Sequence, residues 1–214
     1  MGAVKGPSRT RREQAAETRE RIVRAAIEVF GERGYTGARM ADIASRAGVA
    51  VQTVYFAFHT KPDLLRACYE YAVLGPAQLP PPLQPFWAKV QAARTGRAAL
   101  HEFVVGNADI VERAAVVDEV ARAASHEPDV VTIRNDSEQL RRRGYRELLA
   151  GVADRFGLSP HLDLDTATDL LLVLAGPQVW LALKDNGWTR EQYIAWASDA
   201  VAVQLLAKPG RRPG

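Results

Sequence analysis

Residues 40–49 read MADIASRAGV and residues 51–58 read VQTVYFAF, and these two stretches are the most informative about the structure of the N-terminal part of the chain. Apolar residues recur in each stretch at the spacing of a helix face, which predicts two short helices. Gly48 separates them, as a glycine at the end of a helix does. Two helices of about two turns joined at a glycine indicate a helix-turn-helix.

A longer helix is predicted before this pair and another after it. Apolar residues fall on one face of a helix from about Thr18 to Gly34, and Thr60 with Asp63 forms a capping signal for a fourth helix that runs to about Leu74. The core of the resulting three-helix head is predicted to contain Ile22, Ala26, Phe30, Ile43, Ala44, Ala47, Val49, Val54 and Phe58.

The rest of the chain is predicted to be helical as well. Residues 75–85 (GPAQLPPPLQP) cannot form regular helix, and the sequence from there to about Leu206 has helical spacing with only short breaks. The last two helices are expected at about 166–186 and 190–206, with a kink at Pro177. The predicted fold is all-α with about nine helices: a three-helix N-terminal head followed by a helical ligand-binding and dimerisation domain.

The domain boundaries follow from these elements. We predict a flexible basic arm over residues 1–17, a helix-turn-helix domain over 18–60, a helical domain over 61–207 and a flexible tail over 208–214.

Charge is distributed unevenly along the 214 residues. Residues 1–61 contain 11 Lys and Arg against 6 Asp and Glu, whereas residues 62–214 contain 17 against 19. The net positive charge of the first segment suits phosphate binding, although basic tails also occur on proteins that bind no nucleic acid.

Several classes of protein find little support. A single cysteine, Cys68, allows no internal disulfide, and the arginine-rich start is unlike a secretory signal, so a cytoplasmic protein is expected. The apolar run from Leu170 to Leu183 is shorter than the roughly 20 residues that span a bilayer and is predicted to be a buried helix. The four histidines include no pair at metal-ligand spacing, and His161 to Asp165 is predicted to cap a helix. We therefore expect no catalytic residues, no metal, no cofactor and no membrane partner.

Gly34-Tyr35, the two stretches above and Lys61-Pro-Asp-Leu-Leu65 closely resemble the DNA-binding signature of the TetR/AcrR family of transcriptional regulators, over residues 18–65. The resemblance implies a homodimer, joined through its last two helices, that binds a pseudo-palindromic DNA operator. It also implies a small-molecule effector that releases the protein from DNA, most simply as a repressor. The alternative is a helical small-molecule-binding protein without DNA activity.

The predicted DNA-binding residues lie on the helix that begins at Val51 and beside it. They are Arg39, Gln52, Thr53, Tyr55 and Lys61. Gln52 has the geometry to pair with adenine, and the hydroxyls of Thr53 and Tyr55 can donate to phosphates. Lys61 resembles the family's phosphate-contacting lysine, and Arg39 can reach a phosphate or a base edge. For Tyr55 the alternative is a core aromatic with its hydroxyl at the edge.

Three further features of the head are left with two interpretations. Phe56 either meets a thymine methyl group or packs on the first or fourth helix, and packing is favoured. The arginines Arg9, Arg11 and Arg12 either enter a minor groove or belong to a solvated arm. Arg39 and Ala50 stand where the family commonly has Ser or Thr, so each of the two short helices loses a side-chain cap typically worth about 1 kcal/mol.

The effector site is predicted from aromatic and amide residues of the helical domain. The candidates are Trp87, Phe103, Asn107, Tyr145, Gln178 and Trp180, with Phe86 and His101 as further possibilities. Ordinary core packing is the favoured alternative for each of them.

Overall fold

The computed structural model describes residues 10–207, and every regular element in this range is a helix. The elements are α1 (Arg11–Gly37), α2 (Met40–Ala47), α3 (Val51–Ala57), α4 (Lys61–Leu74), the 3-10 helix η1 (Pro81–Leu83), α5 (Pro85–Ala92), α6 (Gly96–Ala123), α7 (Pro128–Phe156), α8 (Leu164–Leu174), α9 (Pro177–Asp185) and α10 (Arg190–Leu205).

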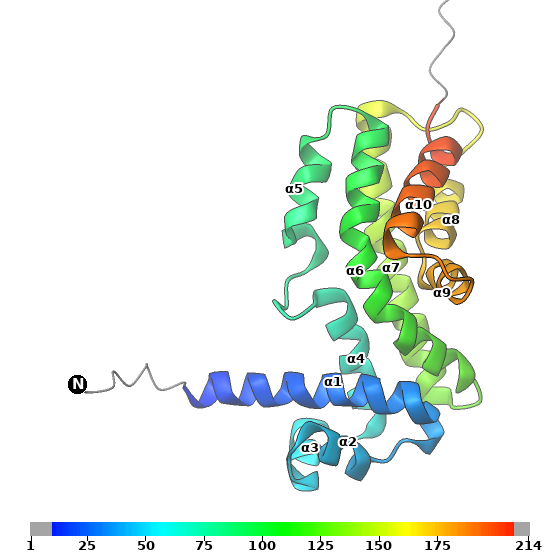
Figure 1. Cartoon of the computed structure of the whole chain (residues 1–214). Coiled ribbons are helices and arrows are strands. Elements are labelled where there is room, and N and C mark those ends of the chain that lie inside the picture. The colour runs from blue at the N-terminus through cyan, green and yellow to red at the C-terminus, as the bar shows by residue number, and fades with distance from the viewer. Residues whose placement is uncertain (1–9, 208–214) are drawn as a thin grey trace, which may run out of the picture.

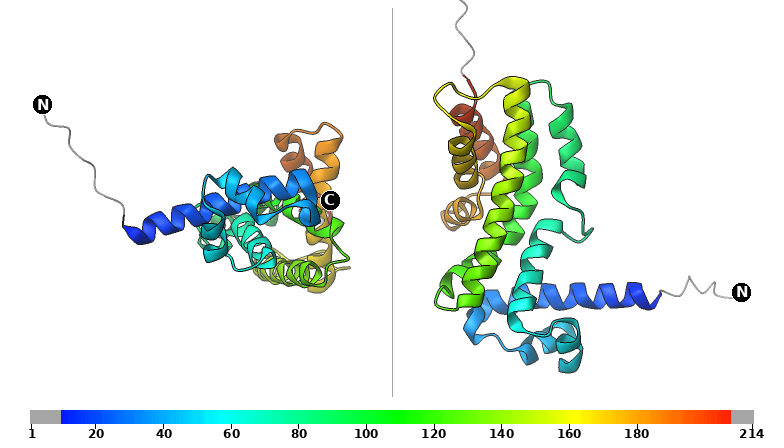
Figure 2. Two further views of the ribbon diagram at one scale, coloured as in Figure 1. Left: turned by 90° about the horizontal axis from the view of Figure 1, so that it is seen from below. Right: turned by 180° about the vertical axis from the view of Figure 1, so that it is seen from behind.

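The helices form a small head at one end and a longer bundle above it. α1 lies across the base of the bundle with α2 and α3 beneath it, and α4 rises from the head to meet α6 and α7 (Figure 1). α5 packs on one side of α6, and α8 and α10 lie on the other side of the bundle, with α7 along the back (Figure 2). The predicted all-α architecture of a three-helix head followed by a helical domain is confirmed.

The expected helix at 166–186 is divided into α8 and α9. Gly176 is extended, with φ −98° and ψ 160°, and Pro177 opens α9. Proline has no N–H to donate to the preceding turn, so the predicted kink becomes a complete break. Within residues 10–207 the structure therefore has ten α-helices rather than about nine.

The first helix begins earlier than expected, which corrects the predicted flexible arm over residues 11–17. Thr10 Oγ1 accepts a hydrogen bond from the Glu13 N–H at 3.3 Å, and the Glu13 carboxylate accepts one from the Thr10 N–H at 2.8 Å. This reciprocal cap starts α1 at Arg11, so Arg11 and Arg12 are helical. Arg9 and the predicted tail over 208–214 lie outside the described residues. At the other end Gly34 has φ +69°, which breaks the helix where its end was predicted.

Two hydrophobic cores hold the molecule together. The first contains eight of the nine predicted head-core residues as buried side chains, with Val49 packed against it as a partly buried one. It continues into α4 and into the lower ends of α6 and α7 through residues such as Val117 and Ile133. The second core fills the upper bundle. The head therefore shares its hydrophobic core with α4 and with the lower ends of α6 and α7.

The most apolar stretch of the chain lies inside this fold. Leu164–Asp185 is long and apolar enough, by length and composition, to cross a membrane. In the structure it is the broken pair α8 and α9, and 44% of the apolar window is buried against the rest of the molecule. Leu171 and Trp180 belong to the second core, but less than half of the window is buried, so the predicted buried helix is instead a broken and partly buried pair.

Candidate nucleic-acid interface

α3 buries one face and exposes the opposite one. Val54 is fully buried, and Phe58 at the C-terminal cap is buried beside it. The exposed positions recur at the spacing i, i+3 and i+4, which places them on one side of the helix. They are Gln52, Tyr55 and Phe56, called here the α3 stripe. His59, which was not among the predicted residues, is also exposed, but it follows the extended Phe58 and lies outside α3.

The predicted DNA-binding residues of α3 are partly brought together. Gln52 lies on the stripe, and Tyr55 is 50% exposed, so Tyr55 is not a core aromatic. Thr53 is only partly buried and lies beside the stripe. The favoured interpretation of Phe56, packing on the first or fourth helix, is wrong because its side chain is 88% exposed.

Arg19 of α1 holds the end of α3. Its guanidinium donates to the Ala57 carbonyl oxygen at 3.0 Å and lies over the Phe58 ring, 4.1 Å from the ring centre. A cation at a helix C-terminus satisfies a carbonyl without an intrahelical partner and interacts favourably with the helix dipole. No local pattern in the sequence predicts this contact, since 38 residues separate Arg19 from Ala57.

Lys61 is directed at the backbone between α1 and α2. Its ammonium donates to the carbonyl oxygens of Tyr35 at 2.9 Å and Ala38 at 3.3 Å, and it lies 4.4 Å from the centre of the Tyr35 ring. Burial raises the pKa of Tyr35 to about 12, so this ring is neutral beneath the cation. The ammonium has a third N–H, so a phosphate contact by Lys61 stays a prediction.

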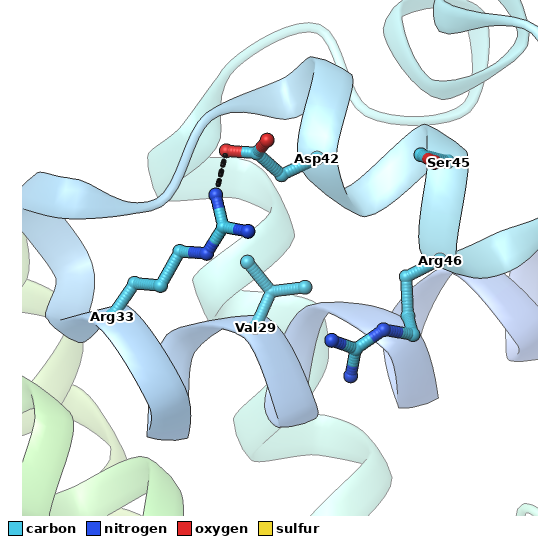
Figure 3. Close-up of a pocket in the computed structure, with 5 residues that line it drawn as sticks. All are labelled: Val29, Arg33, Asp42, Ser45 and Arg46. Carbon is cyan, nitrogen blue, oxygen red and sulfur yellow. Dashed lines mark ion pairs between the residues drawn. The ribbon is translucent and has the colours of Figure 1, made fainter.

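Ion pairs seat α2 on α1. Arg33 of α1 and Asp42 of α2 pair at 2.8 Å, and both line an open hollow of about 340 Å³ with Val29, Ser45 and Arg46 (Figure 3). At the other end of α2 the Arg46 guanidinium pairs with Glu32 at 2.8 Å and with Glu28 at 3.0 Å. The hydrogen bond from Arg46 lowers the pKa of Glu32. The charges that line the hollow are thus used to hold the two helices together.

The two unusual N-caps differ in how they are compensated. Ala50 gives α3 no side-chain cap. At α2 the Arg39 backbone N–H donates a hydrogen bond to the Asp42 carboxylate at 3.3 Å, so one backbone donor at the start of this helix is satisfied. The exposed Arg39 guanidinium makes none of the ion pairs found among residues 10–207, so it is available to a phosphate or a base edge.

The predicted effector residues fall into separate groups. Asn107 Nδ2 donates to Tyr145 Oη at 2.7 Å and to the Ala175 carbonyl at 3.1 Å, and the Tyr145 hydroxyl donates to the same carbonyl at 3.2 Å. Phe103 packs edge-on against Tyr145, with 5.0 Å between ring centres. These residues, together with Ala175 at the end of α8, make a buried polar centre where α6, α7 and α8 meet.

The other three candidates lie outside this centre. Gln178 donates to Asp118 at 2.5 Å, and Asp118 also pairs with Arg134 at 3.0 Å. Trp180 packs on Tyr193 with 5.2 Å between ring centres, and the buried Tyr193 hydroxyl has no hydrogen-bond partner among residues 10–207. Trp87 packs at the edge of the second core. Asp163 accepts from the Thr166 N–H at 2.7 Å, which confirms the predicted cap at that loop and lowers the pKa of Asp163.

The N-terminal head is the part of the chain that is similar in sequence to known proteins. Residues 22–68 match the model of the tetR family of bacterial regulatory proteins. The transcriptional regulator CymR of Pseudomonas putida is 41% identical over 63 residues, which cover 29% of this chain and 31% of CymR. The transcriptional repressor BepR of Brucella suis is 40% identical over 67 residues, covering 31% of this chain and 30% of BepR. The matched segment thus spans about a third of the length of these relatives.

The fold extends the likeness beyond the head. The regulator FadR of Bacillus subtilis, solved in complex with stearoyl-CoA, superposes with a TM-score of 0.66 at 17% identity, over 86% of this chain and 96% of FadR. At that identity the likeness concerns the fold alone. The head thus matches the tetR family of bacterial regulatory proteins over residues 22–68, and the fold of the described residues is similar to that of the regulator FadR.

Proposed function

We propose that this protein is a transcriptional regulator that binds a pseudo-palindromic DNA operator as a homodimer and is released from it by a small molecule. The observation that carries the proposal is the α3 stripe. A helix that protrudes from a folded head with one polar and aromatic side uncovered is the element that enters a DNA major groove about 12 Å wide.

The surroundings of α3 support this assignment. The helix itself, VQTVYFA, has no carboxylate to repel phosphates, and the segment that contains it is net positive. Arg19 and the buried Val54 fix its position, which reduces the cost of ordering it when DNA binds. Gln52 then reads a base edge, while Tyr55 and Arg39 bind the backbone.

The last helices supply a surface for a second copy. Val173 of α8 is 61% exposed and Val203 of α10 is 58% exposed, although both helices otherwise carry core residues. Apolar side chains on adjacent helices at the end of the molecule suit a symmetric helical interface. A dimer presents two α3 helices, and two half-sites about 34 Å apart make the operator pseudo-palindromic.

The buried polar centre is the candidate effector site. Asn107 and Tyr145 can exchange their mutual hydrogen bond for bonds to a ligand. FadR, which shares the fold, was solved with stearoyl-CoA, so this architecture has room for a ligand in at least one protein. Release requires that the ligand favour an arrangement of the two heads that misfits the operator.

A helical binding protein without DNA activity is the competing function. Such a protein has no use for an uncovered aromatic and amide stripe on a helix of seven residues that is clamped at its C-terminus. The α3 stripe therefore favours DNA binding over this alternative.

The experiment that tests the proposal is selection of binding sites from random DNA, followed by affinity measurements on the selected site. We expect a two-fold related sequence, and we expect Gln52→Ala to relax the preference at one base pair by about 1–3 kcal/mol. Ser45→Ala, on the exposed side of α2 away from the stripe, is the matched control and should bind as wild type. Failure to enrich any sequence, at low salt and without effector, would remove the proposed function.

A further inference from the structure

We infer that Phe56 is a specificity-determining residue that reads the 5-methyl group of a thymine in each operator half-site. The inference rests on the proposed function and deepens it by naming one of the bases that α3 recognises.

The exposure of Phe56 is the first observation. Its side chain is 88% exposed, the largest exposed fraction among the large apolar residues exposed within residues 10–207. It packs on neither α1 nor α4, so it contributes little to the core that holds α3 in place. A large apolar side chain left in water on a rigid helix gains free energy only when another surface covers it.

The position of Phe56 on the helix is the second observation. Gln52 and Phe56 are four residues apart on the α3 stripe, which separates them by about 6 Å along the helix axis. Base pairs follow one another about every 3.4 Å, so the two side chains reach bases no more than about two steps apart. A side chain beside Gln52 that can make no hydrogen bond to a base edge is suited to an apolar group in the groove.

The chemistry of the major groove then selects the base. Thymine is the only base of unmodified DNA that presents a methyl group there, and apolar side chains discriminate it by contact with that group. Adenine, the base that an amide pairs with, is the partner of thymine. Gln52 and Phe56 together therefore specify a short A·T-containing element in each half-site.

Charge favours DNA over a protein as the surface that covers Phe56. Residues 1–61 carry 11 Lys and Arg against 6 Asp and Glu, and the exposed Arg39 lies at the start of the neighbouring α2. An exposed apolar residue on a segment of net positive charge matches a groove flanked by phosphates. A second copy of the same chain would instead bring two basic heads together.

The test removes the methyl group from the DNA and the ring from the protein. Each thymine of the selected operator is replaced in turn by deoxyuridine, and the affinities of the wild type and of Phe56→Ala are measured on both DNAs. At one position per half-site we expect the wild type to lose about fourfold in affinity, the worth of one buried methyl group. Phe56→Ala should bind the two DNAs equally, and Phe56→Leu should keep part of the discrimination.

The controls separate the possible failures. Leu83→Ala removes a side chain that is 68% exposed in η1, outside the head, and should retain the wild-type response to deoxyuridine. An unchanged melting temperature for Phe56→Ala shows that the head is intact.

If an operator is selected but no thymine position depends on Phe56, this inference fails while the proposed function stands. If Phe56→Ala changes the oligomeric state and leaves the deoxyuridine response unaltered, the residue is a protein contact and the inference is overturned. If no operator can be selected, both fail.

Discussion

At the scale of the residue, the head depends on cations whose partners are backbone carbonyls. Lys61 binds the carbonyls of Tyr35 and Ala38, and Arg19 binds that of Ala57. Both contacts lie beside the helix-turn-helix rather than within it, and they fix the turn before α2 and the end of α3. A residue that resembles a phosphate contact in sequence thus also has a structural role.

Lys61→Met keeps most of the side-chain length and removes the charge. We expect it to lower the free energy of unfolding by about 1–2 kcal/mol, because two hydrogen bonds from a charged donor are lost in a partly buried place. If the third N–H also reaches a phosphate, the slope of log affinity against log salt falls by about 0.9. Urea unfolding measures the first effect and titration of operator DNA at several salt concentrations the second. An unchanged unfolding free energy would contradict the role of Lys61 in holding the turn.

At the scale of the element, α5 is fitted onto α6 at a single glycine. The Phe86 side chain lies against Gly106, where an added Cβ would be 2.0 Å from Phe86 Cγ. Phe86 also meets Phe103 edge-on, at 6.4 Å between ring centres. The close approach of the two helices therefore requires glycine at position 106, and it brings α5 to the side of α6 that carries Phe103.

Gly106→Ala is expected to destabilise the protein by about 1–3 kcal/mol, because the methyl group occupies the space of the Phe86 ring. The matched control is Gly151→Ala in α7, where an added Cβ has nothing within 4 Å. Alanine is the better helix former, so that control should gain up to about 1 kcal/mol. Both are measured by urea denaturation, and equal behaviour of the two variants would show that α5 does not pack on α6 as closely as described.

At the scale of the whole molecule, the head and the lower end of the bundle share the first hydrophobic core. Head residues such as Ile43 pack in the same cluster as Val120 of α6 and Ile133 of α7. Interiors are close-packed, so the base of α6 cannot shift without repacking the head. The orientation of the two α3 helices in the proposed dimer therefore depends on how the bundles are joined.

Val203→Glu tests whether the two copies of the proposed dimer are joined through α10. An unpaired carboxylate placed in an apolar interface costs several kcal/mol, so we expect the variant to sediment as a folded 23.5 kDa monomer and to lose operator affinity. Leu83→Glu places the same charge at a comparably exposed apolar position outside the last helices and should remain dimeric. A monomeric wild type, or a dimeric Val203→Glu that binds DNA normally, would exclude α10 from the interface.

Much of the fold follows from short-range signals in the sequence. The boundaries of α2, α3 and α4, the cap formed by Thr60 and Asp63, the break at Gly34 and eight of the nine predicted head-core side chains agree with the structure. Periodicity and capping involve residues within a few positions of one another, which is why they can be read without coordinates. The start of α1 was missed although its Thr10 and Glu13 carry the same kind of signal.

The partners of side chains from distant segments follow only from the way the helices pack. The clamp of Arg19 on α3 spans 38 residues, the bond from Asn107 to Tyr145 spans 38, and that from Asn107 to Ala175 spans 68. Phe56 is left exposed because the cores close without it, an outcome set by the packing of α1 and α4 rather than by the neighbours of Phe56 in the sequence. Helix boundaries are local properties of a chain, whereas the exposure and the partners of a side chain depend on which helices pack together.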